Sequence, residues 1–344
     1  MSLLSVRDLR VTFHTADGLV QAVRGVSFDV DAGQTLGIVG ESGSGKTVCT
    51  QALLGLVPGA DVRGQALFAE RDLLTMRPAE LRAIRGARIA MIFQDPLSSL
   101  HPLYRVGWQI EEMIRSHRRV TRRAARARAV ELLDMVGIPH AARRIDDYPH
   151  QFSGGMRQRV MIAMALALEP ELIIADEPTT ALDATVQAQI LDLLKRLRDE
   201  LGTALVLITH DLGVVADMAD EVLVMYAGRI VESSGRRTLY YEPHHPYTKG
   251  LLESIPGAAG TSGTLRPIPG QPPSMIAVPD GCAFHPRCRY AMDRCVVDLP
   301  DLRPVGAGHR SACWLPTNLH GFGEQVEAER ERAARSGQLR ESGA

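Results

Sequence analysis

The sequence predicts an α/β fold, in which a parallel sheet is followed by a shorter, proline-rich extension. Two largely apolar strand patterns, at 35–39 and 172–176, each precede a helical pattern, and such alternation is typical of a parallel sheet covered by helices. The end of the chain differs, because ten of the 20 prolines fall between residues 256 and 320 and proline interrupts helices and central strands. We therefore expect an α/β domain over 1–252, an extension over 253–320 and a charged, disordered tail over 321–344.

The first elements are predicted to be antiparallel strands. Residues 4–39 alternate apolar and polar side chains, and Asp17-Gly18 suits a hairpin turn. Residues 1–13 carry charges among their apolar side chains and lack the basic-then-apolar order of a signal peptide. The sequence therefore predicts an antiparallel β subdomain at the start of a chain that stays in the cytoplasm.

A phosphate-binding loop is predicted between the strand at 35–39 and the helical run that begins at Val48. The segment matches the pattern GxxxxGK[ST], with the residues Gly40, Glu41, Ser42, Gly43, Ser44, Gly45, Lys46 and Thr47. Glycines let consecutive backbone N–H groups point at one anion, while the lysine neutralises terminal phosphates and the threonine hydroxyl reaches Mg²⁺. A chance Gly/Ser turn is the alternative, but the flanking strand and helix favour a nucleoside triphosphate site.

Two adjacent acids, Asp176 and Glu177, follow the second apolar strand. Parallel sheets bind ligands beyond the carboxyl ends of their strands, so these acids are expected beside the phosphate loop. We predict that Asp176 holds Mg²⁺ and that Glu177 is left free to act on water. The alternative is that the two acids only cap the strand. Capping would explain Asp176, but it would not explain a second carboxylate directly before Pro178.

Four further short motifs resemble those of ABC-transporter ATPases in order and spacing. They are Gln94 after the strand pattern 89–93, the segment Phe152-Ser153-Gly154-Gly155-Met156 at a helix start, Ala181-Leu182-Asp183 after the acidic pair, and His210 after the strand pattern 204–209. The resemblance covers roughly residues 4–255. One departure is that the signature motif is FSGGM where LSGGQ is most common, so Met156 cannot supply an amide side chain.

The resemblance implies a P-loop ATPase cassette, with a RecA-like core, an antiparallel β subdomain and a helical subdomain at about 95–155. It implies that Gln94 joins Thr47 and Asp176 at Mg²⁺, that His210 contacts the γ-phosphate and that Phe13 stacks on adenine. Without the resemblance, Phe13 could be plain core and His210 a strand-end histidine. The implied nucleotide-binding residues are Phe13, Ser42, Gly43, Ser44, Gly45, Lys46, Thr47 and Val48.

The signature motif is expected to act on a nucleotide bound by a second cassette. Ser153, Gly154 and Gly155 present N–H groups and a hydroxyl at a helix start, which suits an anion, although an ordinary helix N-cap is the alternative. By resemblance, Asp183 belongs to the D-loop, and two cassettes sandwich each ATP. The catalytic residues implied are Glu177, His210 and Gln94, and a lone chain is expected to hydrolyse ATP poorly.

An arginine-rich stretch lies in the predicted helical subdomain, with no acid within it. Its members are Arg115, Arg118, Arg119, Arg122, Arg123, Arg126 and Arg128. A solvated helix face is the simpler interpretation, and a surface for anionic lipid or a membrane partner is the alternative.

The start of the extension resembles a segment specific to the oligopeptide and dipeptide branch of ABC importers. The matching segments are residues 241–249 (YEPHHPYTK), 268–273 (IPGQPP) and 282–288 (CAFHPRC). Residues 94–102 also resemble this branch, except that His101 stands where asparagine is more usual. The resemblance implies two transmembrane permease subunits, a second homologous ATPase subunit and an extracytoplasmic substrate-binding protein as partners.

Four of the five cysteines lie in the extension, at Cys282, Cys288, Cys295 and Cys313. Disulfides are rare in the cytoplasm, so clustered thiols indicate a metal centre, and something other than a large core is expected to order this proline-rich segment. The spacing is wider than in most zinc sites. By resemblance we expect a [4Fe–4S] cluster, with Zn²⁺ or no metal as alternatives.

Composition argues against a nucleic-acid partner and a membrane span. The chain has 39 basic and 40 acidic residues, which gives no overall positive field for a phosphate backbone. Its apolar stretches are shorter than the roughly 20 residues that cross a bilayer. We therefore expect a peripheral protein at the cytoplasmic face of the cell membrane that hydrolyses ATP to power peptide import. The alternatives are a soluble ABC ATPase acting on nucleic acid or the ribosome, and a metal-bound interaction module.

Overall fold

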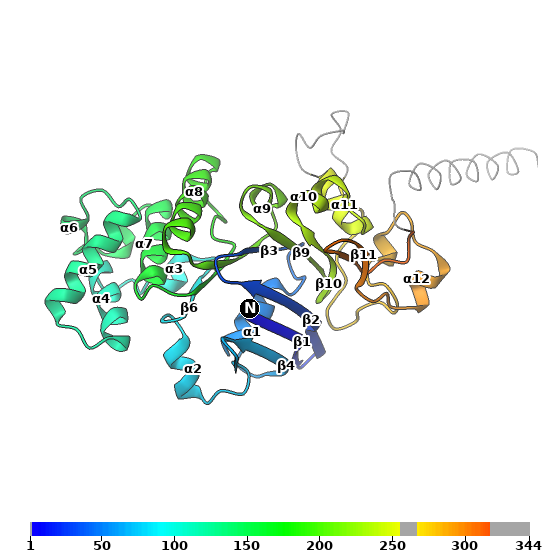
Figure 1. Ribbon diagram of the computed structural model, residues 1–344, viewed down its shortest axis with the longest axis horizontal. Coiled ribbons are helices and arrows are strands. Elements are labelled where there is room, and N and C mark those ends of the chain that lie inside the picture. Colours follow the sequence, from blue (N-terminus) through cyan, green and yellow to red (C-terminus); the bar gives the residue numbers. More distant parts are fainter. Residues whose placement is uncertain (1, 255–266, 317–344) are drawn as a thin grey trace, which may run out of the picture.

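The computed structural model describes residues 2–254 and 267–316, and its strands form two sheets. A four-stranded sheet has the order β2-β1-β4-β5, and an eight-stranded sheet has the order β11-β12-β10-β9-β3-β8-β7-β6. Figure 1 shows α4, α5 and α6 at one end of the molecule and α12 at the other, with the central strands between them. The predicted tail at 321–344 lies outside the described residues.

The four-stranded sheet is antiparallel. It consists of β1 (Ser2–Thr15), β2 (Gly18–Asp31), β4 (Ala60–Phe68) and β5 (Arg71–Asp72). The turn between β1 and β2 occupies residues 16–17, so the hairpin lies where the sequence predicts one. Leu4, Val6, Leu9 and Val11 of β1 are all fully buried and pack toward α1 (Lys46–Leu53), which follows the phosphate loop.

The eight-stranded sheet has a parallel centre. β6 (Ile89–Ile92), β7 (Leu172–Asp176), β8 (Ala204–Thr209), β3 (Thr35–Val39) and β9 (Glu221–Tyr226) run parallel. Every residue of β3, β7 and β8 is buried, which explains why these strands read as apolar runs rather than alternating patterns. β10 (Arg229–Gly235) turns back antiparallel to β9 through residues 227–228, as the sequence predicts.

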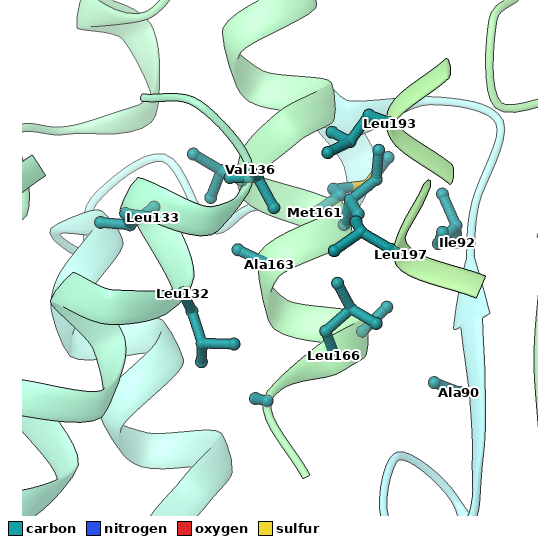
Figure 2. Close-up of a cluster of buried hydrophobic side chains, with 14 of the residues drawn as sticks. Ala90, Ile92, Leu132, Leu133, Val136, Met161, Ala163, Leu166, Leu193 and Leu197 are labelled. Atoms are coloured by element: carbon teal, nitrogen blue, oxygen red, sulfur yellow. The ribbon is translucent and has the colours of Figure 1, made fainter. Parts of the chain in front are cut away.

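A helical region follows β6. It contains α3 (Pro96–Ser99), α4 (Val106–His117), α5 (Arg122–Met135) and α6 (Ala141–Arg144), and α7 (Gly154–Leu166) leads back into β7. α8 (Ala184–Leu201) and α9 (Leu212–Met218) flank β8, while α2 (Pro78–Ile84) precedes β6. Figure 2 shows Leu132 of α5, Ala163 of α7 and Leu193 of α8 contributing to a common apolar core that reaches β6.

Several members of the arginine-rich stretch form ion pairs with acids from other segments. Arg126 bonds both Glu111 and Asp146, Arg122 also approaches Glu111, and Arg128 pairs with Glu169. These contacts fasten α5 to its neighbours, so part of the positive charge is neutralised within the helical region. They favour the interpretation of a solvated, ion-paired helix face.

The extension joins the central sheet. After α10 (Arg236–Tyr241) and α11 (Pro246–Glu253) come α12 (Asp293–Val297), β11 (Arg303–Gly306) and β12 (His309–Ser311). β12 pairs with β10, and β11 pairs with β12 at the sheet edge. Tyr226, Tyr247 and Phe284 form a buried aromatic group between the cassette and the extension. No helix within the described ranges is long and apolar enough to cross a membrane.

Candidate functional site

A pocket of about 880 Å³ lies beyond the carboxyl ends of β3, β7 and β8. It brings together the phosphate loop, Gln94, Glu177, His210 and Phe13, which the sequence places in one site although they are far apart along the chain. The other lining residues come from β2, from α11 and from the extension; they are Val20, Ala22, Leu251, Ser254, Pro267, Ile268 and Met275.

The phosphate loop needs glycine where it bends into α1. Gly45 has φ +98°, and a Cβ atom on it would lie 2.3 Å from the carbonyl oxygen of Ala22. Both the left-handed backbone and this close approach exclude larger residues. The loop is also joined to the β9–β10 turn, because the Gly228 amide donates to the Ser44 carbonyl oxygen at 3.0 Å.

Lys46 is buried at the centre of the loop. Its Nζ donates to the carbonyl oxygens of Gly40 at 2.7 Å and Glu41 at 3.0 Å. Burial lowers the pKa of this ammonium group, and the carboxylates of Glu177 and Asp176 oppose that shift. The lysine therefore lies in a confined position where a phosphate would supply further anionic partners.

Thr47 and Asp176 meet at the end of β7. The Thr47 hydroxyl donates to Asp176 Oδ1 at 2.9 Å. Burial raises the pKa of Asp176, while the hydrogen bond from Thr47 lowers it. A hydroxyl and a carboxylate oxygen side by side next to a phosphate loop are ligands of the kind that Mg²⁺ uses with nucleotides. These two residues therefore fit the predicted magnesium site.

Glu177 is the centre of a small hydrogen-bond network. Its Oε2 accepts from Gln94 Nε2 at 3.1 Å and from the Thr180 hydroxyl at 2.9 Å, and it lies 3.3 Å from His210 Nδ1. The backbone of Glu177 has φ +45°, an uncommon conformation for a residue with a side chain. The fold thus brings together the three residues that the sequence assigns to catalysis.

The signature residues do not line this pocket. Ser153 is the N-cap of α7, and its hydroxyl accepts from the Met156 amide at 3.4 Å. Gly155 lies against α8, where a Cβ atom would be 2.5 Å from Val186 Cγ1. The Met156 sulfur accepts from Arg144 at 3.4 Å. Gly154 and the exposed Ser153 begin the same helix, and neither residue lines the pocket that contains the chain's own phosphate loop.

Asp183 caps α8. Its Oδ1 accepts from the amides of Thr185 at 3.1 Å and Val186 at 3.0 Å. This is an ordinary N-cap role, which the sequence pattern does not distinguish from a role between two cassettes.

The nucleoside end of the pocket is mainly apolar. Phe13 and Val20 come from the β1–β2 hairpin, Val48 follows the loop, and Ile268 and Met275 come from the extension. Aromatic and aliphatic walls of this kind suit a flat base. Phe13 is therefore in a position where it can contact a nucleobase.

The sequence did not reveal two residues that reach this site, Arg287 of the extension and Tyr247 of α11, which precedes it. Arg287 bonds the carboxylate of Glu41 in the phosphate loop, and Tyr247 Oη accepts from the Glu41 amide at 2.7 Å. Thr180, which holds Glu177, was also missed. The segment that contains Tyr247 was recognised only as a family marker, so a family resemblance was the one signal that could have identified it.

The predicted metal cluster in the extension is wrong. Among the described residues, which include Cys282, Cys288, Cys295 and Cys313, no three His, Cys, Asp or Glu side chains are arranged to hold a metal ion. The cysteines instead line a cavity of about 10 Å³, enough for about one water molecule. The [4Fe–4S] cluster is therefore not supported, and no site for its zinc alternative is found among these residues.

The extension is ordered by apolar packing and by strand pairing, so it does not depend on a metal centre for its structure. Burial raises the pKa of Cys313 to about 12, which favours its neutral thiol. The thiols pack with aromatic and aliphatic side chains, including Phe284 and Leu315. Together with the pairing of β12 to β10, this packing supplies the core that the proline-rich sequence did not predict.

Two family profiles match the sequence. "ABC transporter" matches residues 23–180, and "Oligopeptide/dipeptide transporter, C-terminal region" matches residues 231–295. Both agree with the resemblance inferred from the motifs.

Individual relatives and solved structures agree with these profiles. The oligopeptide transport ATP-binding protein OppD of Bacillus subtilis is 50% identical, over 94% of this chain and 91% of that protein. The dipeptide transport ATP-binding protein DppD of the same species is 49% identical, over 91% of this chain and 94% of that protein. The dimeric post-hydrolysis structure of the ATP-binding cassette MJ0796, bound to ADP and Pi, has a TM-score of 0.62 at 29% identity, and the match covers 68% of this chain and 99% of that one. The chain therefore belongs to the ABC transporter ATPases, in the family of oligopeptide and dipeptide transport ATP-binding proteins.

Proposed function

We propose that this chain hydrolyses ATP to power the import of peptides through a membrane ABC transporter. The observation that carries the proposal is the convergence in one pocket of the phosphate loop, whose Thr47 bonds Asp176, and of Glu177 with Gln94 and His210. Relatives named as oligopeptide and dipeptide transport proteins support peptides as the transported class. A nucleic-acid function has less support, since 39 basic residues are balanced by 40 acidic ones.

The proposed reaction uses the pocket as an electrostatic cage for phosphoryl transfer. The phosphates lie on the N–H groups of residues 42–48 and beside Lys46, while the base lies against Phe13. Thr47, Asp176 and Gln94 are the proposed ligands of Mg²⁺, which neutralises phosphate charge when bound. Glu177 polarises the attacking water, and His210 steadies the γ-phosphate.

A second cassette completes the proposed site. The α7 N-terminus, with Ser153, Gly154, Gly155 and Met156, lies outside the chain's own pocket, which supports a role at a partner's nucleotide. In this arrangement Asp183 lies in the D-loop between the cassettes. We propose a second homologous ATPase subunit as the partner, so that closure of the pair on ATP is coupled to hydrolysis.

The permease contact is proposed at an apolar groove beside β6. This groove, of about 320 Å³, is lined by Phe93, which precedes Gln94, and by methionines from β6, α4 and α7: Met91, Met113, Met161 and Met164. Methionine-rich surfaces adapt to apolar helices. We propose that a helical segment of a permease subunit occupies the groove, where its movement would be transmitted through Phe93 to the adjacent Gln94.

The remaining partners and the location follow from this assignment. We propose that the chain is peripheral, at the cytoplasmic face of the membrane, with two permease subunits and an extracytoplasmic substrate-binding protein in the complex. Residues 1–252 form the ATPase domain, with its helical subdomain at about 95–155, and residues 253–320 form the extension.

The first prediction tests the role of Glu177. In the assembled transporter, Glu177→Gln should lower ATP turnover by roughly 10²–10⁴-fold, because the amide cannot act as a base. Binding of Mg-ATP, measured by titration calorimetry, should stay within about twofold of wild type, because the phosphate loop is intact.

Glu131→Gln is the matched control, since Glu131 is an exposed acid on α5. It should leave both turnover and binding unchanged. Normal hydrolysis by Glu177→Gln would remove this residue from the proposed reaction.

A further inference from the structure

The extension contacts the phosphate loop through one arginine. Arg287 Nη1 lies 2.6 Å from Glu41 Oε2, and Arg287 Nη2 lies 2.9 Å from Glu41 Oε1. This is a two-bond, fork-to-carboxylate pair, the strongest common geometry for such ions. The partners are 246 residues apart in sequence, so the contact is made by the fold and not by local structure.

Contacts other than the one with Glu41 also hold Arg287 in position. Its Nε donates to the Pro269 carbonyl oxygen at 2.9 Å, and Nη1 also donates to the Tyr226 hydroxyl at 3.3 Å. The guanidinium lies near the rings of Tyr226 and Phe284. Its side chain is only 5% exposed. A buried guanidinium held by four hydrogen bonds is a rigid counter-charge, unlike a surface ion pair.

Glu41 lies inside the phosphate site. Its carbonyl oxygen accepts from Lys46 Nζ, its amide donates to Tyr247 Oη, and its side chain is part of the pocket lining. The charge of Glu41 is among those that raise the pKa of Lys46, which means that the two charged groups interact. An unneutralised carboxylate at this place would repel a triphosphate.

Residues Met275 and Ile276 of the extension also contact the elements that form the nucleotide site. The Met275 carbonyl oxygen accepts from the Gln21 amide at 3.2 Å. A Cβ atom on Gly18 or Gly228 would lie 3.1 Å from the side chains of Ile276 and Met275, respectively. These contacts place the extension against the β1–β2 hairpin and the β9–β10 turn, next to the residues that line the pocket.

We propose that Arg287 is a positioning residue for ATP binding, which neutralises Glu41 and holds it in place so that the phosphate loop accepts a triphosphate. The extension is then part of the nucleotide site, and displacement of Arg287 would lower ATP affinity. This inference rests on the proposed assignment of residues 40–47 as the ATP site. It differs from that assignment because it adds a residue outside the cassette motifs.

The test compares the full-length chain with Arg287→Met, Glu41→Gln and the double variant, with Mg-ATP titrated by calorimetry. Arg287→Met should weaken binding by about tenfold, because it leaves the Glu41 charge uncompensated. Glu41→Gln should bind within about threefold of wild type, and the double variant should recover most of the lost affinity. Added salt should reduce the defect of Arg287→Met, because it screens the repulsion.

Recovery in the double variant separates charge compensation from simple structural damage, which a second substitution would not repair. Wild-type affinity in Arg287→Met, or a double variant as weak as Arg287→Met, would overturn the inference. Arg287→Gln also removes the charge but keeps a polar side chain. It decides the question if Arg287→Met does not fold, and wild-type affinity in Arg287→Gln would then overturn the inference.

Two controls separate this inference from the proposed function. Arg294→Met removes an exposed arginine of the same extension, paired with Asp298, and should bind ATP normally. Lys46→Ala should abolish binding. If Lys46→Ala binds as wild type, the assignment of the ATP site itself is wrong, whereas a defect in Lys46→Ala without one in Arg287→Met rejects only the role of Arg287.

Discussion

At the scale of single residues, Glu177 shows how the fold prepares a reactive group. Its left-handed backbone, with φ +45°, costs on the order of 1 kcal/mol or more and persists only where surrounding contacts enforce it. Three side chains converge on one of its oxygens, from Gln94, Thr180 and His210. The carboxylate is thereby held at the pocket wall in one orientation, which is what a group that must align a water molecule requires.

Thr180 is predicted to matter for turnover and not for ATP binding. Thr180→Val keeps the shape of the side chain but removes the hydrogen bond to Glu177, so kcat should fall by roughly three- to tenfold while KM stays the same. Steady-state ATPase assays of the assembled transporter give both constants.

Thr75→Val is a suitable control, because the Thr75 hydroxyl bonds a main-chain carbonyl at an exposed turn outside the pocket. An equal loss in both variants, or a rise in KM for Thr180→Val alone, would contradict the positioning of Glu177 by Thr180.

At the scale of elements, α11 and β12 are fastened to β10 by one buried carboxylate. Glu232 accepts from the amides of His244 at 2.6 Å and His245 at 3.0 Å, and it lies 2.7 Å from His309 Nε2. His245 in turn caps α11 through its Nδ1, which accepts from the Tyr247 amide at 3.1 Å. The two histidines at 244–245 are thus buried packing residues, and their segment joins the cassette to the extension.

The burial of His245 predicts a pH-dependent stability. Desolvation lowers its pKa to about 4, whereas an unfolded histidine titrates near 6.5. Above pH 6.5 neither state binds the proton. Between about pH 6.5 and 4 the unfolded chain binds a proton that the folded chain does not, so the free energy of unfolding falls by about 1.4 kcal/mol per pH unit from this residue.

His245→Asn separates this effect from the other titrating groups. Asparagine still offers an N-cap acceptor to α11 but does not titrate in this range. Chemical denaturation at several pH values should show a shallower loss of stability for His245→Asn than for wild type below pH 6.5. His150→Asn, at an exposed histidine, should follow wild type; the same slope for wild type and His245→Asn would refute the prediction.

At the scale of the whole molecule, the two anion-binding features of the cassette are separated. The phosphate loop leads into α1 beneath the central sheet, whereas the signature begins α7, which packs against the helical region. A helix N-terminus with an exposed serine does not line the chain's own pocket. This arrangement is the reason to expect that hydrolysis depends on a pair of cassettes.

Ser153→Arg is predicted to separate binding from hydrolysis. In the isolated chain, Mg-ATP should bind as in wild type, because Ser153 is outside the pocket. In the assembled transporter, turnover should fall by roughly a hundredfold or more, because the surface proposed to meet the partner's γ-phosphate is blocked and loses a donor.

Ser116→Arg, a matched change at an exposed serine at the end of α4, should leave turnover unchanged. A weaker ATP affinity of the isolated Ser153→Arg chain would show instead that the signature acts on the chain's own nucleotide.

Local sequence patterns were sufficient to predict a feature wherever one short segment contains both its backbone structure and its functional residues. The loop around Gly45 and Lys46 could be read from the sequence, because its backbone conformation requires glycine at set positions. The strand ending at Asp176 could be read because buried parallel strands are continuously apolar. The cysteines misled because their spacing does not show that the thiols line a small, largely apolar cavity, and among the described residues no metal-binding group is found there.

The sequence by itself determined the α/β cassette and its phosphate loop, since these depend on backbone requirements and apolar periodicity that are local. It indicated the family by the resemblance of its short motifs. Only the tertiary structure decided which side chains surround Glu177, how the extension is ordered and that Arg287 neutralises Glu41. These features depend on pairs of residues up to 246 positions apart. Such contacts arise when β12 pairs with β10 and Tyr247 is buried, and no local pattern in the chain encodes them.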